Sequence, residues 1–125
     1  MILGLGIDIL ETSRIARELS QGEWLGEDGI FTAGEIDYCS SAGMPARRYA
    51  ACFAAKEATL KALGVQVPDL AMFREVEVGP GSDRSCKVTL YDRLKGESER
   101  LGVRRIRLSI THDANQSAAI VILEA

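Results

Sequence analysis

The segment from Pro45 to Gly64 constrains this chain most, because it carries the start and stop signals of a long helix. Proline is favoured at the first helical position, where its missing N–H is not needed, and glycine is favoured just beyond the last turn. The residues between them are rich in alanine, a strong helix former. We therefore predict a long helix that runs from Pro45 to Leu63.

The other segments predict strands and shorter helices. From Ile2 to Ile9, apolar residues alternate with glycines and one acid, which is the period of a strand. Thr12 and Ser13 are expected to cap a short helix that ends near Ser20. Further along we predict a helix with a capping box of Thr32 and Glu35 that runs to about Cys39, a hairpin of Glu75–Val78 and Cys86–Leu90, a helix over Tyr91–Leu101, and strands over Arg104–Thr111 and Ser117–Leu123.

These elements predict an α+β fold. Because 125 residues fit one compact domain, residues 1–125 are expected to form a single domain. In it, a small antiparallel sheet would pack against the long central helix and the shorter helices.

Composition argues against several kinds of function. A formal net charge of −3 does not supply the basic field that non-specific nucleic-acid binding needs, so no nucleic-acid partner is expected. Three cysteines without a CxxC pair indicate neither a disulfide framework nor a zinc site. The N-terminal apolar run has no basic leader and is broken by Asp8, so no export signal or membrane anchor is expected. We therefore expect a cytoplasmic protein.

Asp8 is out of place in a strong strand, where aspartate is disfavoured. It shares one face of the strand with Gly4 and Gly6, and glycines there leave room for another group to approach closely. Two interpretations stay open. Asp8 is either a buried acid that caps a helix or pairs with an arginine, or part of a binding site.

Glu57 and Lys61 are unusual for their position on the long helix. The helical period places them on one face with Phe53 and Leu60, among large apolar side chains. The simpler interpretation is a pair of opposite charges four residues apart, which contributes little to stability. The alternative is a functional pair that faces a ligand.

His112 is the only histidine, and it ends a predicted strand on the same face as that strand's apolar residues. A histidine in such a setting is often a hydrogen-bonded core residue. The hydroxyls of Ser109 and Thr111 lie on the opposite face, together with arginines. Either face could meet an anionic ligand at the strand end, and the pattern does not decide between them.

Taken together, two carboxylates, a lysine and a histidine in unexpected settings favour a phosphate site. Mg²⁺ takes oxygen ligands, usually one or two carboxylates with phosphate oxygens. A lysine beside it would neutralise phosphate charge, and a histidine could bind phosphate or move a proton. No Walker loop, dinucleotide fingerprint or nucleophile elbow occurs in the chain, so the common nucleotide and hydrolase scaffolds are not indicated.

The segments that carry these residues resemble the acyl-carrier-protein synthase type of phosphopantetheinyl transferase. GLGIDILETSRI from Gly4 resembles the opening motif of that family, FAAKEATLKALG from Phe53 its central helix, and LSITH from Leu108 its last motif. Their order and spacing also fit, and the resemblance spans nearly the whole chain. It implies the 4′-phosphopantetheinyl transferase fold and transfer of phosphopantetheine from coenzyme A to a serine of an apo acyl carrier protein, with release of adenosine 3′,5′-bisphosphate. Fatty acid biosynthesis is the expected pathway, and polyketide synthesis stays open as the alternative.

By this resemblance Asp8 and Glu57 would bind Mg²⁺, and Lys61 would contact the phosphates of coenzyme A. Gly64 would lie at the coenzyme A site. Asp8, Glu57, a metal-held water and the histidine all stay open as acceptors of the serine proton. The family acts as a homotrimer, so the resemblance also implies sites built between subunits.

The resemblance assigns further residues to substrate binding. His112, with Ser109 and Thr111 beside it, would bind the nucleotide or promote transfer. Arg14 and Arg17 on the first helix would contact the acidic carrier protein.

The chain departs from the family pattern in three places. Cys52 stands where the family usually has an arginine, so one phosphate contact is expected either to be missing or to come from Arg47 or Arg48 instead. Val65 and Gln66 follow Gly64 where the family often has a second glycine, which predicts a different loop shape near the nucleotide. The first helix is also less basic than is usual in the family.

Two other functions compete with the transferase. One is a non-catalytic trimeric binding module of the same fold, which would not need all four of Asp8, Glu57, Lys61 and His112. The other is an unrelated metal-dependent phosphohydrolase, which is disfavoured because the chain has no clustered His and Asp metal motif.

Overall fold

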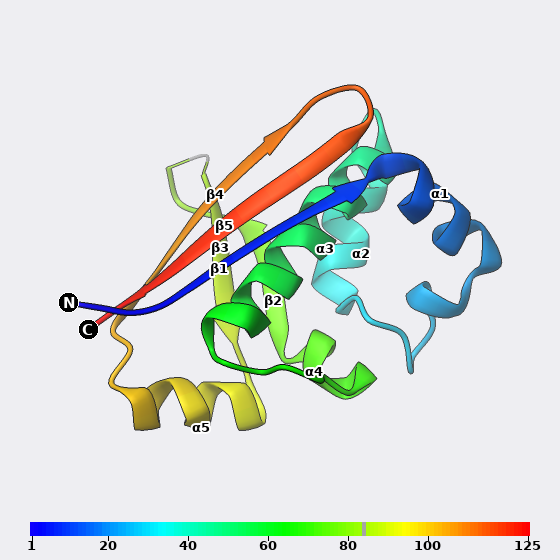
Figure 1. Cartoon of the computed structure of the whole chain (residues 1–125). Helices are drawn as coiled ribbons and strands as arrows, with labels where there is room; N and C mark the ends of the chain where they lie inside the picture. Colours follow the sequence, from blue (N-terminus) through cyan, green and yellow to red (C-terminus); the bar gives the residue numbers. More distant parts are fainter. Residues whose placement is uncertain (84) are drawn as a thin grey trace.

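The first and last strands of the chain lie side by side (Figure 1). The structure is a computed structural model, and it describes residues 1–83 and 85–125. Strand β1 (Ile2–Glu11) pairs antiparallel with β5 (Gln116–Glu124), and β4 (Arg105–His112) pairs with the other edge of β5. The strand order is therefore β1-β5-β4. Helix α3 (Pro45–Ala62) packs against one face of this sheet, where it contacts β1 and β5. The predicted antiparallel sheet with a central helix is confirmed.

The remaining elements are a second, smaller sheet and the shorter helices. A two-stranded antiparallel sheet contains β2 (Val76–Pro80) and β3 (Cys86–Leu90). The other helices are α1 (Thr12–Gln21), a 3₁₀ turn η1 (Glu23–Leu25), α2 (Ala33–Ser40), α4 (Leu70–Arg74) and α5 (Asp92–Leu101). Among the helices described, none combines the length and apolarity needed to cross a bilayer.

Two glycines of β1 allow α3 to approach the sheet closely. A Cβ added to Gly4 would lie 2.2 Å from the carbonyl oxygen of Ala62, and one added to Gly6 would lie 1.8 Å from that of Ala58. Such distances leave no room for any side chain. The group that the glycines admit is therefore the backbone of α3, and it brings the C-terminal half of this helix alongside Asp8.

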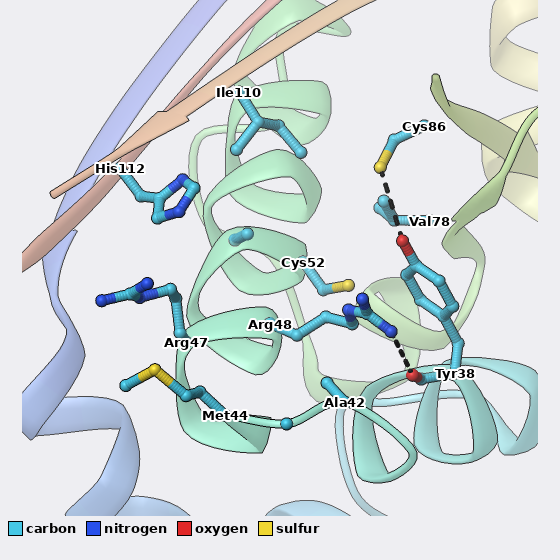
Figure 2. A pocket seen from close by; sticks show the side chains of 12 residues that line it. Tyr38, Ala42, Met44, Arg47, Arg48, Cys52, Val78, Cys86, Ile110 and His112 are labelled. Carbon is cyan, nitrogen blue, oxygen red and sulfur yellow. Dashed lines mark hydrogen bonds between the residues drawn. The ribbon is translucent and has the colours of Figure 1, made fainter. Parts of the chain in front are cut away.

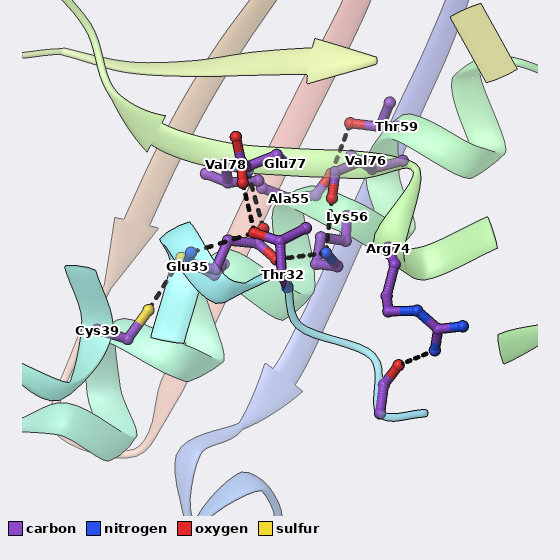
Figure 3. Close-up of polar contacts among 12 residues, drawn as sticks. Thr32, Glu35, Cys39, Ala55, Lys56, Thr59, Arg74, Val76, Glu77 and Val78 are labelled. Carbon is purple, nitrogen blue, oxygen red and sulfur yellow. Dashed lines mark hydrogen bonds and ion pairs between the residues drawn. The ribbon is translucent and has the colours of Figure 1, made fainter. Parts of the chain in front are cut away.

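A buried ion pair fixes α3 from the other side (Figure 3). Lys56 and Glu35 are both fully buried, and the lysine Nζ donates to Glu35 Oε1 at 2.6 Å and to the carbonyl oxygen of Val76 at 2.6 Å. Glu35 also accepts from the backbone N–H groups of Thr32 at 2.9 Å and Val78 at 2.8 Å. Burial raises the pKa of Glu35 and lowers that of Lys56, and these hydrogen bonds oppose both effects. The pair ties α2, α3 and β2 together and so sets the rotation of α3.

Most predicted helix ends are correct, but one cap is wrong. The capping box of Thr32 and Glu35 is present, and Gly64 adopts the left-handed conformation (φ +82°) that ends α3. Helix α1 forms as predicted, yet Thr12 and Ser13 do not cap it: Glu11 occupies the N-cap position, and no side chain caps the helix. The reason is that strand β1 continues to Glu11, so Thr12 is already the first helical residue.

Candidate active site

The close approach of α3 to β1 places Lys61 against Asp8. Lys61 Nζ donates to Asp8 Oδ1 at 3.0 Å and to the carbonyl oxygen of Ile7 at 3.1 Å. Asp8 is almost buried, with 9% of its surface exposed, whereas 52% of the Lys61 side chain is exposed. The ion pair that Lys61 makes within the described residues is therefore with Asp8 on β1, and not with Glu57 one helical turn away. One side of the lysine remains open to an anionic ligand.

Glu57 is the second acid of this group. Partial burial, a hydrogen bond to Asp8 and the negative charge of Asp8 raise the pKa of Glu57 to about 7. The positive charges of Lys61 and Arg14 act in the opposite direction. Two carboxylates thus face each other at a distance where they compete for a proton, with two cations nearby. This is the half of the predicted site that the structure brings together within one chain.

The donor set of this acid pair fits Mg²⁺. Both groups offer only carboxylate oxygens, and their mutual repulsion would be relieved by a cation between them. No cluster of three or more His, Cys, Asp or Glu side chains that could hold a metal occurs in the described ranges, 1–83 and 85–125. A site with two protein carboxylates suits an ion that takes its other ligands from water and substrate phosphate.

A small cavity of about 150 Å³ lies next to the acid pair. Glu57, Lys61 and the loop residues that follow α3, Val65, Gln66 and Pro68, line it together with Leu60. Val65 and Gln66, the two residues that depart from the family pattern after Gly64, therefore line the same space as Glu57. The altered loop is placed where it can contact a ligand.

His112 lies at a second, larger cavity, of about 460 Å³ (Figure 2). Its basic lining residues are Arg47, Arg48 and His112, and its apolar wall includes Met44, Val78 and Ile110. Cys52 forms part of the floor, and its thiol hydrogen-bonds with that of Cys39 at 3.4 Å between the sulfur atoms. A cavity with apolar walls and basic groups suits a ligand with a flat ring and an anionic group.

The two cavities lie on opposite sides of α3. Arg48 precedes Glu57 by nine residues, which is half a turn around the helix axis and roughly 14 Å along it. The strand register gives the same result, because Asp8 on β1 and His112 on β4 are separated by β5, or roughly 10 Å across the sheet. One chain therefore presents its acid pair and its histidine in different directions.

The structure also places the other predicted site residues. Ser109 and Thr111 are exposed on the sheet face that points away from α3, and so on the opposite face from His112. Arg14 and Arg17 are exposed on α1. Gly64 is exposed at the end of α3, in its left-handed conformation.

Sequence patterns alone did not indicate the buried partnership of Lys56 with Glu35, or the cavity beside Arg47 and Arg48. The burial of Lys56 could not be predicted, because its neighbours in the sequence, Ala55 and Glu57, do not indicate which face of the helix is buried. The capping box at Thr32 was the available signal for Glu35, since its carboxylate had to lie near the start of α2.

This fold is that of a known class of transferase. The family model described as the 4′-phosphopantetheinyl transferase superfamily matches residues 4–121. The chain therefore belongs to the 4′-phosphopantetheinyl transferase superfamily.

The relatives of the chain indicate which family within the superfamily it belongs to. The chain is 40% identical to the holo-[acyl-carrier-protein] synthase of Geobacter sp. (strain M21) over 124 residues, which cover 99% of each chain. The solved holo-[acyl-carrier-protein] synthase from Neisseria meningitidis superposes with a TM-score of 0.87 at 30% identity, covering 100% of both chains. The enzyme from Bacillus anthracis, solved in complex with coenzyme A (3′,5′-ADP), has a TM-score of 0.78 at 28% identity, covering 100% of this chain and 98% of that one. Within the superfamily, the family of this chain is that of the holo-[acyl-carrier-protein] synthases.

Proposed function

We propose that this protein transfers 4′-phosphopantetheine from coenzyme A to a serine of an apo acyl carrier protein. The observation that carries the proposal is the group formed by Asp8, Glu57 and Lys61, in which two facing carboxylates and a half-exposed ammonium surround a space open to a ligand. The names of the relatives and the coenzyme A bound to a structural neighbour support the same substrates.

In this reaction the serine Oγ attacks the β-phosphorus of coenzyme A. The bond between that phosphorus and the bridging oxygen breaks, and adenosine 3′,5′-bisphosphate leaves. Asp8 and Glu57 would hold Mg²⁺, which supplies charge neutralisation for the diphosphate when bound. Lys61 donates to the phosphate oxygens, where negative charge increases during transfer. The serine proton leaves to an acceptor beside the phosphate, and the two carboxylates are the nearest such groups on this side of α3.

The complete site would be shared between copies of the chain in a closed homotrimer. Two observations support this. The acid pair and His112 face different directions, so one ligand meets both only if the histidine comes from a neighbouring copy. In addition, the part of the sheet face away from α3 that β1 and β5 form is apolar and open, with Leu5 60% exposed, Ile7 63%, Ile9 62% and Ile120 37%. A continuous apolar sheet face of this kind is typical of a protein interface.

The nucleotide end of coenzyme A would occupy the cavity beside His112 of the neighbouring copy. The apolar wall with Met44 and Ile110 suits the adenine, and the basic residues suit its phosphate. Ser109 and Thr111 lie on the sheet face that would meet the next copy, where their hydroxyls would be available to a part of the ligand outside this cavity. Gly64 would contribute its exposed backbone.

Arg14 and Arg17 would dock the carrier protein, whose surface is expected to be acidic. Both are exposed on α1, and Arg14 is close enough to Glu57 to influence its pKa. A carrier bound there would bring its serine next to the acid pair. The pathway that this serves would be fatty acid biosynthesis in the cytoplasm, where three free thiols would stay reduced.

Intact mass spectrometry tests the function directly. The protein is incubated with apo carrier protein, coenzyme A and Mg²⁺, and the carrier should gain the mass of one phosphopantetheine. A parallel reaction with the Asp8→Ala variant controls for transfer by a contaminating enzyme. If several apo carriers gain no mass while coenzyme A still binds, the protein is a binding module and the proposed transfer is wrong.

A further inference from the structure

The three cysteines of the chain come from three different elements but lie around one cavity. Cys52 on α3 and Cys86 on β3 line the larger cavity, which also contains His112 (Figure 2). Cys39 on α2 contacts Cys52 from the side of the apolar core. The proposed transfer gives none of these thiols a task, so their arrangement needs a separate explanation.

Cys39 and Cys52 are in direct contact. Their sulfurs are 3.4 Å apart, with Cys39 fully buried and Cys52 only 2% exposed. A disulfide bond is about 2.05 Å long, so the sulfurs need to approach by only about 1.4 Å, which side-chain rotation and small movements of α2 and α3 can supply. The fold therefore holds two thiols from different helices in position for a cross-link.

Cys52 is the member of the pair that an oxidant can reach, because it lines the cavity. It also stands where the family usually has an arginine, so the pair depends on a residue particular to this chain. The hydrogen bond to Cys39 and burial both raise the pKa of the Cys52 thiol. The thiol therefore keeps its proton at neutral pH and reacts slowly. The equilibrium is a separate matter, since it is set by how closely the fold holds the two sulfurs together.

A cross-link between these cysteines would join the two helices that shape the cavity. Tyr38, which precedes Cys39 on α2, forms part of the cavity wall, whereas Cys52 forms part of the floor. Arg48 Nη1 donates to the carbonyl oxygen of Tyr38 at 3.0 Å, and its guanidinium lies 4.4 Å from the centre of the Tyr38 ring. Drawing the sulfurs together moves the floor relative to this wall. A ligand that fits the reduced cavity should therefore bind the oxidised one less tightly.

We propose that Cys39 and Cys52 are a redox switch, in which a hydroperoxide converts the two thiols into a disulfide that joins α2 to α3 and weakens ligand binding in the cavity. The Cys52 sulfur attacks one peroxide oxygen, the O–O bond breaks, and water leaves with the thiol proton, which gives a sulfenic acid. The Cys39 sulfur then attacks the Cys52 sulfur, the S–O bond breaks, and a second water leaves. Two thiols and one hydrogen peroxide thus give one disulfide and two waters. A thiol reductant reverses the change by exchange.

Peptide mapping by mass spectrometry tests the cross-link directly. Wild type, Cys39→Ser, Cys52→Ser and Cys86→Ser are treated with hydrogen peroxide, and the remaining thiols are alkylated after denaturation. Wild type and Cys86→Ser should each lose about 2 Da and contain a linked Cys39–Cys52 peptide, whereas the other two variants should not. Because the cross-link restricts the unfolded chain, the oxidised wild type should have a Tm higher by about 5 °C or more, and dithiothreitol should reverse this.

Calorimetry with adenosine 3′,5′-bisphosphate tests the effect on the cavity. This choice of ligand rests on the proposed function, whereas the cross-link does not. Binding is measured in the Cys86→Ser background, so that oxidation of Cys86 at the cavity cannot contribute. Peroxide should weaken binding by at least about threefold, and dithiothreitol should restore it. The double variant Cys52→Ser/Cys86→Ser should bind the nucleotide equally before and after peroxide.

The outcomes separate the switch from the proposed function. If the oxidised wild type contains no Cys39–Cys52 peptide, or if Cys52 is linked to Cys86 in its place, the proposed pair is wrong. A cross-link that leaves the nucleotide affinity unchanged would show that the pair is no switch. If the reduced protein does not bind the nucleotide at all, the nucleotide site of the proposed function is contradicted, and the linked peptide and the Tm still decide whether the pair forms.

Discussion

Asp8 and Glu57 bring two negative charges into a partly buried space, and their pairing has no structural need. Asp8 is already paired with Lys61, and Glu57 is half-buried on α3 without being part of the apolar core. Burying the second acid beside the first costs stability through desolvation and through like-charge repulsion, and both raise the pKa of Glu57. Acids arranged against each other in this way are typical of a functional site.

The first prediction is that Asp8→Ala and Glu57→Ala each reduce transfer at least about a hundredfold, because each removes one of the two carboxylates that would hold Mg²⁺. Neither side chain is part of the apolar core, so both variants should stay folded, with a cooperative unfolding transition and the far-UV spectrum of the wild type. Rates are measured with EDTA-treated protein at defined Mg²⁺ concentrations. A variant that works at the wild-type rate in this assay would show that its acid is no metal ligand.

The second prediction concerns pH. The pKa of Glu57 is about 7 in the folded protein and 4.5 ordinarily, so between these values the folded state binds more protons than the unfolded state. Protonation of Glu57 therefore stabilises the fold fully below about pH 4.5, and this contribution is lost as the pH rises through about 7. Glu57→Gln cannot ionise and should lack this dependence.

Thermal unfolding of both proteins between about pH 5 and about pH 8 checks this. The Tm of Glu57→Gln minus that of the wild type should increase with pH. Added Mg²⁺ should raise the wild-type Tm more at the higher pH, where it no longer displaces a proton, and should act weakly on the variant. A difference in Tm that stays constant with pH would contradict the raised pKa.

At the scale of elements, the contact between β1 and α3 positions the acid pair. The third prediction tests it with Gly6→Ala, whose added methyl group would overlap the carbonyl oxygen of Ala58 at 1.8 Å. Because backbone must move on both elements, the substitution should lower the free energy of unfolding by about 1–3 kcal/mol or more and reduce transfer as Asp8 and Lys61 separate.

The matched control is Gly96→Ala in α5, where the added methyl group meets open space. Alanine is the better helix former, so this variant should be more stable than the wild type by about 0.5–1 kcal/mol, with unchanged activity. Denaturant unfolding measures both. Equal effects of the two substitutions would show that the close approach at Gly6 has no energetic importance.

Local signals predicted the elements well and their partners less well. Pro45 and Gly64 define α3 because end signals act within one turn, and Gly4 and Gly6 indicated a close approach because only a missing side chain permits one. Local signals could not predict the partner of Lys61. Its neighbour on the helix is Glu57, four positions earlier, whereas Asp8 comes close to Lys61 only through the tertiary contact between β1 and α3. The alternation in β1 likewise gives two faces without saying which one is buried, and the apolar one is open.

At the scale of the whole molecule, charge on α1 should direct the carrier protein to the acid pair. The fourth prediction is that Arg14→Glu raises the KM for the carrier far more than the KM for coenzyme A, because it reverses the charge at an exposed docking position. The effect should diminish as salt is added, since screening weakens contacts between exposed charges. Arg100→Glu on α5 controls for net charge. Equal effects of Arg14→Glu on both substrates would remove it from the docking surface.

The division of the site across α3 leads to the last prediction, that active sites form only between copies of the chain. If Asp8→Ala and His112→Ala subunits are refolded together in equal amounts, a site is intact where an unmodified acid meets an unmodified histidine of the next copy. In a closed head-to-tail trimer each condition holds with a probability of about one half, so about a quarter of the wild-type activity should return. Each variant alone should be nearly inactive.

A double variant mixed with wild type controls for losses in refolding, and native mass spectrometry confirms that mixed trimers have formed. If all the residues came from one chain, every subunit would carry a lesion and mixing would restore nothing. Mixed trimers without recovered activity would therefore reject the shared site, and a monomer in native mass spectrometry would leave the open apolar face of Leu5, Ile7 and Ile9 without the partner that we assign to it.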